Sequence, residues 1–157
     1  MKVLVSGSVR GIDNHDLRSQ IYAAAGDLGK CLAQAGHTLL VGSDDREDID
    51  PFVVEGFQSV QKAPPVEVHL MKGAKSCCSG KTIKNLWHRY DDWDVTVLEV
   101  VRDVAQGVIV IGGKTGVIQA RHCRVDVGLI HHSIWRLRRR GRKSMGVWQL
   151  RSASLLF

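Results

Sequence analysis

Small and polar residues follow three apolar runs of the sequence, and their types suit the binding of a phosphate group. Glycines let backbone N–H groups approach a phosphate closely, and serine or threonine hydroxyls donate hydrogen bonds. An arginine or lysine nearby adds positive charge. A single loop of this kind is more often a tight turn, but three together predict an anion or nucleotide site. The candidate ligand-binding residues are Ser6, Gly7, Ser8, Arg10, Gly42, Ser43, Gly112, Gly113, Lys114, Thr115 and Gly116.

Two better-known phosphate motifs are absent from these loops. The triplets that begin at Gly80 and Gly113 resemble the end of a P-loop, which also requires a glycine five positions before its Gly-Lys pair. Lys75 and Val108 occupy those positions. Gly7 and Gly11 also lack the spacing of a dinucleotide-dehydrogenase loop.

Other reactive side chains give weaker signals. The histidines show no metal-ligand spacing, and the four cysteines fit neither a metal site nor a disulfide framework. We therefore expect no metal and no cofactor, and the sequence identifies no catalytic residue. Trp87, Tyr90 and Trp93 suit stacking on a base, but at this spacing they suit core packing as well.

The predicted elements bring the small residues to one edge. The patterns predict strands over residues 2–5, 38–41, 66–71 and 108–111, and helices after Asn14, from Pro51 and around 93–104, with residues 72–84 as a loop. Alternating strands and helices predict an α/β fold, a Rossmann-like doubly wound parallel sheet in three layers, truncated after the fourth strand. Ligands bind such sheets at the carboxyl ends of the strands, where the strand order reverses.

A family resemblance rests on these loops. Ser6-Gly7-Ser8 with Arg10, the helix ending at Ala35-Gly36-His37, the strand ending at Gly42-Ser43 and the late Gly112–Gly116 loop resemble one Rossmann-like superfamily. This superfamily contains the Lonely guy phosphoribohydrolases and the related SLOG nucleotide-sensor domains. The resemblance covers residues 1–120 and implies a pocket for a nucleotide-derived ligand. For the sensor branch it implies recognition of a nucleotide signal in a bacterial stress or defence system.

The sequence departs from the enzyme branch of that superfamily. Lonely guy enzymes carry Pro-Gly-Gly-x-Gly-Thr-x-x-Glu, whose glutamate serves N-glycosidic chemistry. Here Ile111 replaces the proline, Val117 replaces the threonine, and the glutamate position falls on Gln119 or Ala120. Because cleavage needs a carboxylate to stabilise a cation-like sugar, these changes favour binding or sensing over hydrolysis. A nucleoside monophosphate phosphoribohydrolase remains the alternative, with Asp94 or Glu99 as replacement carboxylates.

Charge and hydropathy limit the partners. Residues 1–120 carry a net charge of −2 and residues 121–157 one of +8, so the body is not basic and we expect no nucleic-acid partner for it. The sequence contains no apolar run of membrane length and no signal-peptide pattern, which predicts a cytoplasmic protein without a membrane partner. An exposed edge at residues 108–111 predicts a homo-oligomer.

The basic tail, residues 121–157, lacks steady helical or strand periodicity. It has three interpretations: an Arg-rich arm that binds nucleic acid, a solvated helix, or the product of a frame shift. The frame shift is favoured, because a coding sequence for residues from Arg121 onward, read one base later, can encode a small-residue helix, an apolar strand and a glycine-rich loop. Those are the elements that a truncated sheet of this kind lacks.

Overall fold

The computed structural model describes residues 1–42, 45, 47–80 and 82–112. Within these residues the chain forms a five-stranded parallel sheet in the order β4-β3-β2-β1-β5. The strands are β1 (Lys2–Ser8), β2 (Thr38–Val41), β3 (Val66–Leu70), β4 (Ile83–Trp87) and β5 (Gly107–Gly112). The helices are α1 (His15–Gln34), α2 (Asp50–Gln58) and α3 (Trp93–Asp103).

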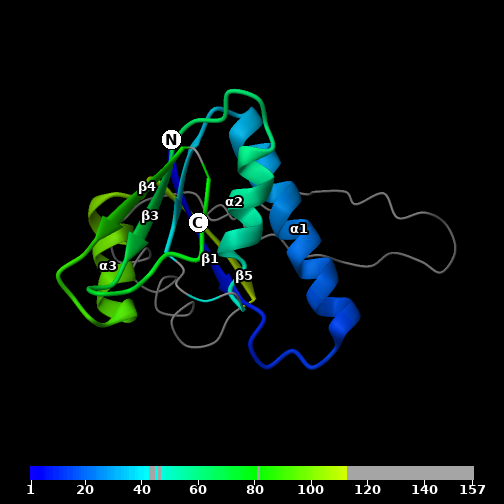
Figure 1. Ribbon diagram of the computed structural model, residues 1–157, viewed down its shortest axis with the longest axis horizontal. Coiled ribbons are helices and arrows are strands. Elements are labelled where there is room, and N and C mark those ends of the chain that lie inside the picture. The colour runs from blue at the N-terminus through cyan, green and yellow to red at the C-terminus, as the bar shows by residue number, and fades with distance from the viewer. Residues whose placement is uncertain (43–44, 46, 81, 113–157) are drawn as a thin grey trace, which may run out of the picture.

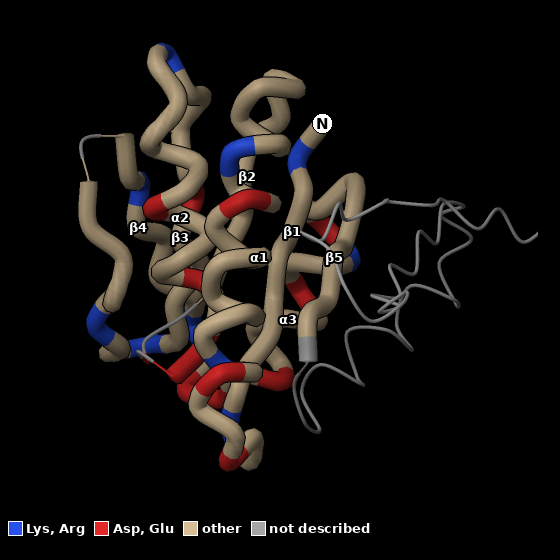
Figure 2. The backbone as a smooth tube through the Cα atoms, turned by 90° about the vertical axis from the view of Figure 1, so that its right-hand side faces the viewer, with Lys and Arg blue, Asp and Glu red and all other residues tan. Residues whose placement is uncertain are grey.

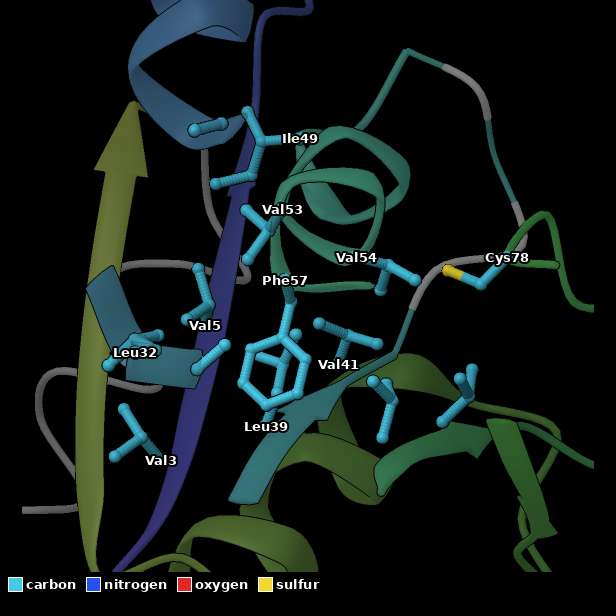
Figure 3. Packing of buried hydrophobic residues seen from close by; sticks show 14 of the residues in the cluster. Val3, Val5, Leu32, Leu39, Val41, Ile49, Val53, Val54, Phe57 and Cys78 are labelled. Carbon is cyan, nitrogen blue, oxygen red and sulfur yellow. The ribbon is translucent and has the colours of Figure 1, made fainter. Parts of the chain in front are cut away.

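Helices cover both faces of the sheet, so the predicted three-layer α/β architecture is confirmed (Figure 1). Alternation along β1 sends Val3 and Val5 toward α1 and α2, and Leu4 toward α3. The larger core lies under α1 and α2, where Phe57 packs among side chains of β1 and β2 (Figure 3). None of the helices in the described ranges is long and apolar enough to cross a membrane.

Local sequence signals explain where α1 begins and ends. The Asn14 side chain accepts a hydrogen bond from the backbone N–H of Leu17 at 2.9 Å, as expected of an N-cap. Gly36 follows the helix with a φ of 70°, a conformation that glycine adopts without steric cost. The sequence predicted Gly36 as the stop of this helix and left Asn14 and Asp13 as alternative caps.

Two predicted element bounds and the predicted number of strands are wrong. The end of the predicted loop 72–84 enters β4, which pairs with β3 in register from Val66↔Ile83 to Leu70↔Trp87. The predicted polar loop after residue 5 continues as strand, because pairing of β1 with β5 extends to Ser8↔Gly112. The sheet is also larger than a four-stranded one. Residues 108–111 are half-buried.

Candidate functional site

The strand order reverses between β1 and β5, and the predicted residues Ser8 and Gly112 end these two strands. The chain moves outward from β1 through β2 to β3, then returns to place β5 on the other side of β1. Both strands end at the same level, because Ser8 is in register with Gly112. The adjacent β2 ends at Val41, next to Gly42. In doubly wound sheets, this reversal is where ligands bind.

Ser6 and Gly7 lie below this edge rather than on it. Ser6 is 7% exposed and in register with Val110. A Cβ at Gly7 would lie 2.0 Å from the backbone oxygen of Ile111, so the glycine permits close packing of β1 on β5. Only Ser8 of the three residues reaches the end of the strand, where its side chain is partly exposed.

Arg10 is held by the acidic segment that follows β2. Residues 47–49 cross the end of β1: the Ile49 N–H donates to the Gly7 oxygen at 3.2 Å, and Ser8 bridges Asp48 in antiparallel fashion. The Arg10 guanidinium pairs with Asp45 and lies 3.9 Å from a Glu47 oxygen. A ligand phosphate at Arg10 would therefore compete with these carboxylates.

Trp93 fills the space beside Gly42. A Cβ at Gly42 would lie 1.8 Å from Cη2 of this indole, which begins α3. The N-cap Asp92 fixes that helix start by accepting the N–H groups of Asp94 and Val95 at 2.7 and 3.2 Å. The absence of a side chain at Gly42 therefore permits close contact with the Trp93 ring. As a result the Trp93 indole, and not exposed backbone, lies at the end of β2.

Asp50 is a buried carboxyl that the sequence reasoning did not single out. It is the first residue of α2 and 3% exposed, and its Oδ2 accepts the Gly42 N–H at 3.2 Å. Its Oδ1 is buried and has no hydrogen-bond partner among the described residues. Burial raises the pKa of Asp50 to about 8, with a smaller contribution from Asp48 and an opposing one from Gly42. The carboxyl is therefore mostly protonated at neutral pH.

The remaining predicted residues fall outside the described part of the chain. These are Ser43, Gly113, Lys114, Thr115 and Gly116. Their contribution to a phosphate site stays a prediction. Gly112, which leads directly into the last four, is the final residue of β5.

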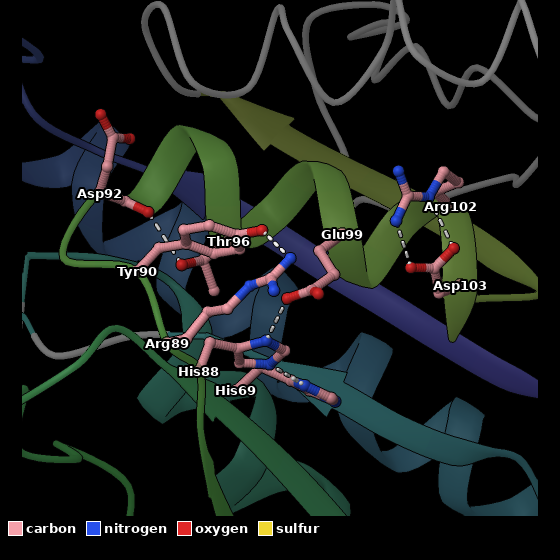
Figure 4. Close-up of polar contacts among 9 residues, drawn as sticks. All are labelled: His69, His88, Arg89, Tyr90, Asp92, Thr96, Glu99, Arg102 and Asp103. Atoms are coloured by element: carbon pink, nitrogen blue, oxygen red, sulfur yellow. Dashed lines mark hydrogen bonds and ion pairs between the residues drawn. The ribbon is translucent and has the colours of Figure 1, made fainter.

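A second polar network lies between the sheet and α3 (Figure 4). Nδ1 of His88 lies 2.8 Å from a Glu99 oxygen, and its Nε2 lies 2.9 Å from Nδ1 of His69. When both rings are neutral, His88 donates to Glu99 and His69 donates to His88. Nε2 of His69 is then unprotonated, and it is buried without a hydrogen bond in the described structure. It lies 3.9 Å from an oxygen of Glu67, whose carboxylate pairs with Lys2.

Burial dominates the titration of His69. Loss of solvent lowers its pKa to about 4, assisted by His88 and by Lys2 and opposed by Glu67. The carboxylate of Glu99 is committed to His88, which weakens its candidacy as the missing catalytic carboxylate. No group of three or more metal-ligating residues is found within the described ranges.

Two surface cavities are lined by other side chains, and none of the predicted residues that the structure describes lines either cavity. One, of about 490 Å³, lies between α2 and the segment before β4, with Pro51, Cys77 and Cys78 in its lining. Burial, followed by the charge of Asp50, raises the pKa of the Cys78 thiol to about 12, so this thiol is a poor nucleophile. The other, of about 310 Å³, lies between α1 and α2 beside the stacked Tyr22 and Phe52 rings.

Comparison with known proteins gives a fold relationship. No family model matches the sequence, and no curated protein matches it. Among solved structures, the chain is similar to the X-ray structure of TM1055, a structural genomics target, with a TM-score of 0.62 and 20% identity. The match covers 81% of this chain and 69% of that one. At this identity the likeness shows the Rossmann-like α/β fold.

Proposed function

We propose that this chain binds a nucleotide-derived small molecule at the carboxyl edge of the sheet, between β1 and β5. The observation that carries the proposal is the register of Ser8 with Gly112 at the point where the strand order reverses. Small residues at the level ends of two strands allow a phosphate to approach the backbone closely at this edge. The N–H groups of Val9 and Arg10 already donate to the Glu47 oxygen and to Ser8 Oγ, so a ligand would replace these bonds.

The neighbouring groups suit the rest of such a ligand. Trp93 is half-buried beside Gly42 and packs against the core under α3, and a base would stack on the part of its ring that stays exposed. The predicted loop 113–116 would complete the phosphate contacts, with Lys114 contributing charge. The role that follows is recognition of a nucleotide signal, as in the sensor domains that the sequence resembles.

Isothermal titration of the full chain with AMP, ADP-ribose, cyclic ADP-ribose and NAD tests the proposal. We expect at least one of them to bind, and Ser8→Asp to weaken that binding at least about tenfold, because a carboxylate would face the phosphate. Ser19→Asp on the exposed surface of α1 adds the same charge elsewhere and should leave binding unchanged. No binding by any of the four, or equal loss in both variants, would refute the site.

The N-glycosidase alternative differs in its product. A phosphoribohydrolase would release free base from a nucleoside monophosphate, whereas a sensor would leave the ligand intact. Chromatography of the ligand after incubation with the protein separates the two functions. We expect intact nucleotide.

A further inference from the structure

We propose that the surface formed by β4 and the chain that flanks it binds single-stranded nucleic acid. It lies on the β3–β4 side of the sheet, whereas the candidate nucleotide site lies at the ends of β2, β1 and β5. The two proposals are therefore independent. This proposal departs from the expectation that the body has no nucleic-acid partner, which rested on a net charge averaged over residues 1–120.

The chain of this surface is basic up to Tyr90, after which the exposed Asp91 and Asp92 follow. Residues 68–90 contain no Asp or Glu and five Lys or Arg residues. Figure 2 shows Lys and Arg segments on the side of the sheet that β4 occupies. The four that the structure describes are exposed: Lys72, Lys75, Lys84 and Arg89.

Most of the other described Lys and Arg residues are paired with a carboxylate, whereas these four are not. Elsewhere, Lys2, Arg10, Lys30 and Arg102 each form an ion pair with a nearby carboxylate. None of the four on the β4 surface forms an ion pair within the described part of the chain. Their charge is available to a polyanion, which would release counterions on binding.

Aromatic side chains lie among the cations. Trp87 is 59% exposed although it belongs to a strand, so the core-packing alternative does not apply to it. Its indole N–H donates to the Ala74 oxygen at 3.0 Å, which fixes the ring against the chain that carries Lys72 and Lys75. The Lys72 N–H in turn donates to the Tyr90 oxygen at 2.6 Å, and the Arg89 guanidinium lies 4.7 Å from the Tyr90 ring centre.

Protection of a sheet edge explains only part of this arrangement. Edge strands often carry lysine to prevent pairing with other chains, and Lys84 on β4 fits that role. Lys72, Lys75 and Arg89 lie outside the strand, and an exposed tryptophan does not protect an edge. Fixed aromatic rings among unpaired cations are instead the combination that binds unpaired bases and their phosphates.

Fluorescence anisotropy of the full chain with a labelled oligothymidylate of about twelve nucleotides measures this binding. Because the tail is basic in every variant, charge-matched pairs isolate the β4 surface. Lys72→Gln with Lys75→Gln should weaken binding about tenfold at low salt and reduce the slope of log affinity against log salt by about 1.4. Lys30→Gln with Lys62→Gln removes the same charge from other surfaces and should change neither quantity appreciably.

Stacking requires a second pair of variants. Trp87→Leu keeps an apolar side chain but should weaken binding at least about fivefold, and Trp87→Tyr should restore most of the affinity. Thermal melting monitored by circular dichroism confirms that each variant folds. The proposal is overturned if both lysine pairs weaken binding equally, or if Trp87→Leu binds like the parent. It is also overturned if polyglutamate of the same length binds as tightly as the oligonucleotide, because the surface would then recognise acidic peptides.

Discussion

Replacing Asp50 by asparagine should change how the free energy of unfolding depends on pH. The carboxyl has its ordinary pKa of 3.8 when the chain is unfolded and a pKa of about 8 when it is folded. The folded state therefore holds the proton more tightly, and its stability declines as the pH rises from about 4 through about 8. Each pH unit in that window costs about 1.4 kcal/mol, so the parent loses about 4 kcal/mol between about pH 5 and pH 8.

The asparagine variant lacks this titration. Its side-chain oxygen can accept the Gly42 N–H as Oδ2 does, while its NH₂ takes the place of the unpartnered Oδ1. An unsatisfied buried donor costs about 1–3 kcal/mol at every pH. The stability difference between variant and parent should therefore shift by about 4 kcal/mol in favour of the variant from about pH 5 to pH 8.

Urea unfolding of both proteins across this range measures the difference directly. His69 titrates in the opposite sense: its stabilising contribution is present above its unfolded pKa of 6.5 and is lost as the pH falls toward about 4. This contribution cancels when the two proteins are compared. Asp27→Asn, on the exposed surface of α1, should follow the parent at every pH. If the curve for Asp50→Asn also runs parallel to the parent, Asp50 is ionised in the folded state and the reasoning is wrong.

Three further predictions concern other parts of the molecule. Gly42→Ala should destabilise the fold by about 1–3 kcal/mol, because its Cβ would overlap the Trp93 ring. Adding Trp93→Leu to the same chain should recover part of the lost stability. If Gly42→Ala alone unfolds in urea at the same concentration as the parent, this packing is contradicted. The imidazole nitrogen chemical shifts of His69 should show a neutral ring down to about pH 4, and a midpoint near 6.5 would contradict its burial. Sequencing the coding DNA should reveal codons after Ala120 that permit the shifted reading frame, and codons that forbid it would end the frame-shift hypothesis.

The alternation of strands and helices could be predicted from the sequence because each buried element has a clear apolar pattern. Val108–Ile111 and Thr38–Val41 are short runs that end in glycine, and both form parallel strands. The bounds were harder to predict. Ser6 to Ser8 are small enough for a loop, but their backbone groups continue the pairing with β5.

β4 was missed because its pattern is weak. The strand pairs through its backbone with β3, and its side chains are mostly exposed or half-buried, so it lacks an apolar period. An Asn and a Lys within five residues, preceded by a segment rich in Gly, Ser and Lys, favour a loop in any local analysis. Only the position of β3 supplies the partner that makes this segment a strand.

The candidate site could be predicted only in part. Small residues after apolar strands identify the carboxyl edge, since parallel strands all end there. The aromatic partner of Gly42, the carboxylates around Arg10 and the burial of Asp50 depend on contacts between distant segments. An aspartate immediately before Pro51, after a run of acidic residues, was the one local signal that marked Asp50 as a helix start.

Mapping backbone amide chemical shifts while ADP-ribose is added tests the nucleotide site most directly. Binding at the reversal of strand order should move the amide signals of Ser8, Gly42 and Gly112 most, and should leave those of Lys2, Thr38 and Gly107, at the opposite ends of the same strands, unchanged. Shifts confined to the opposite ends of these strands, or to the helices, would contradict the assignment of ligand binding to this edge.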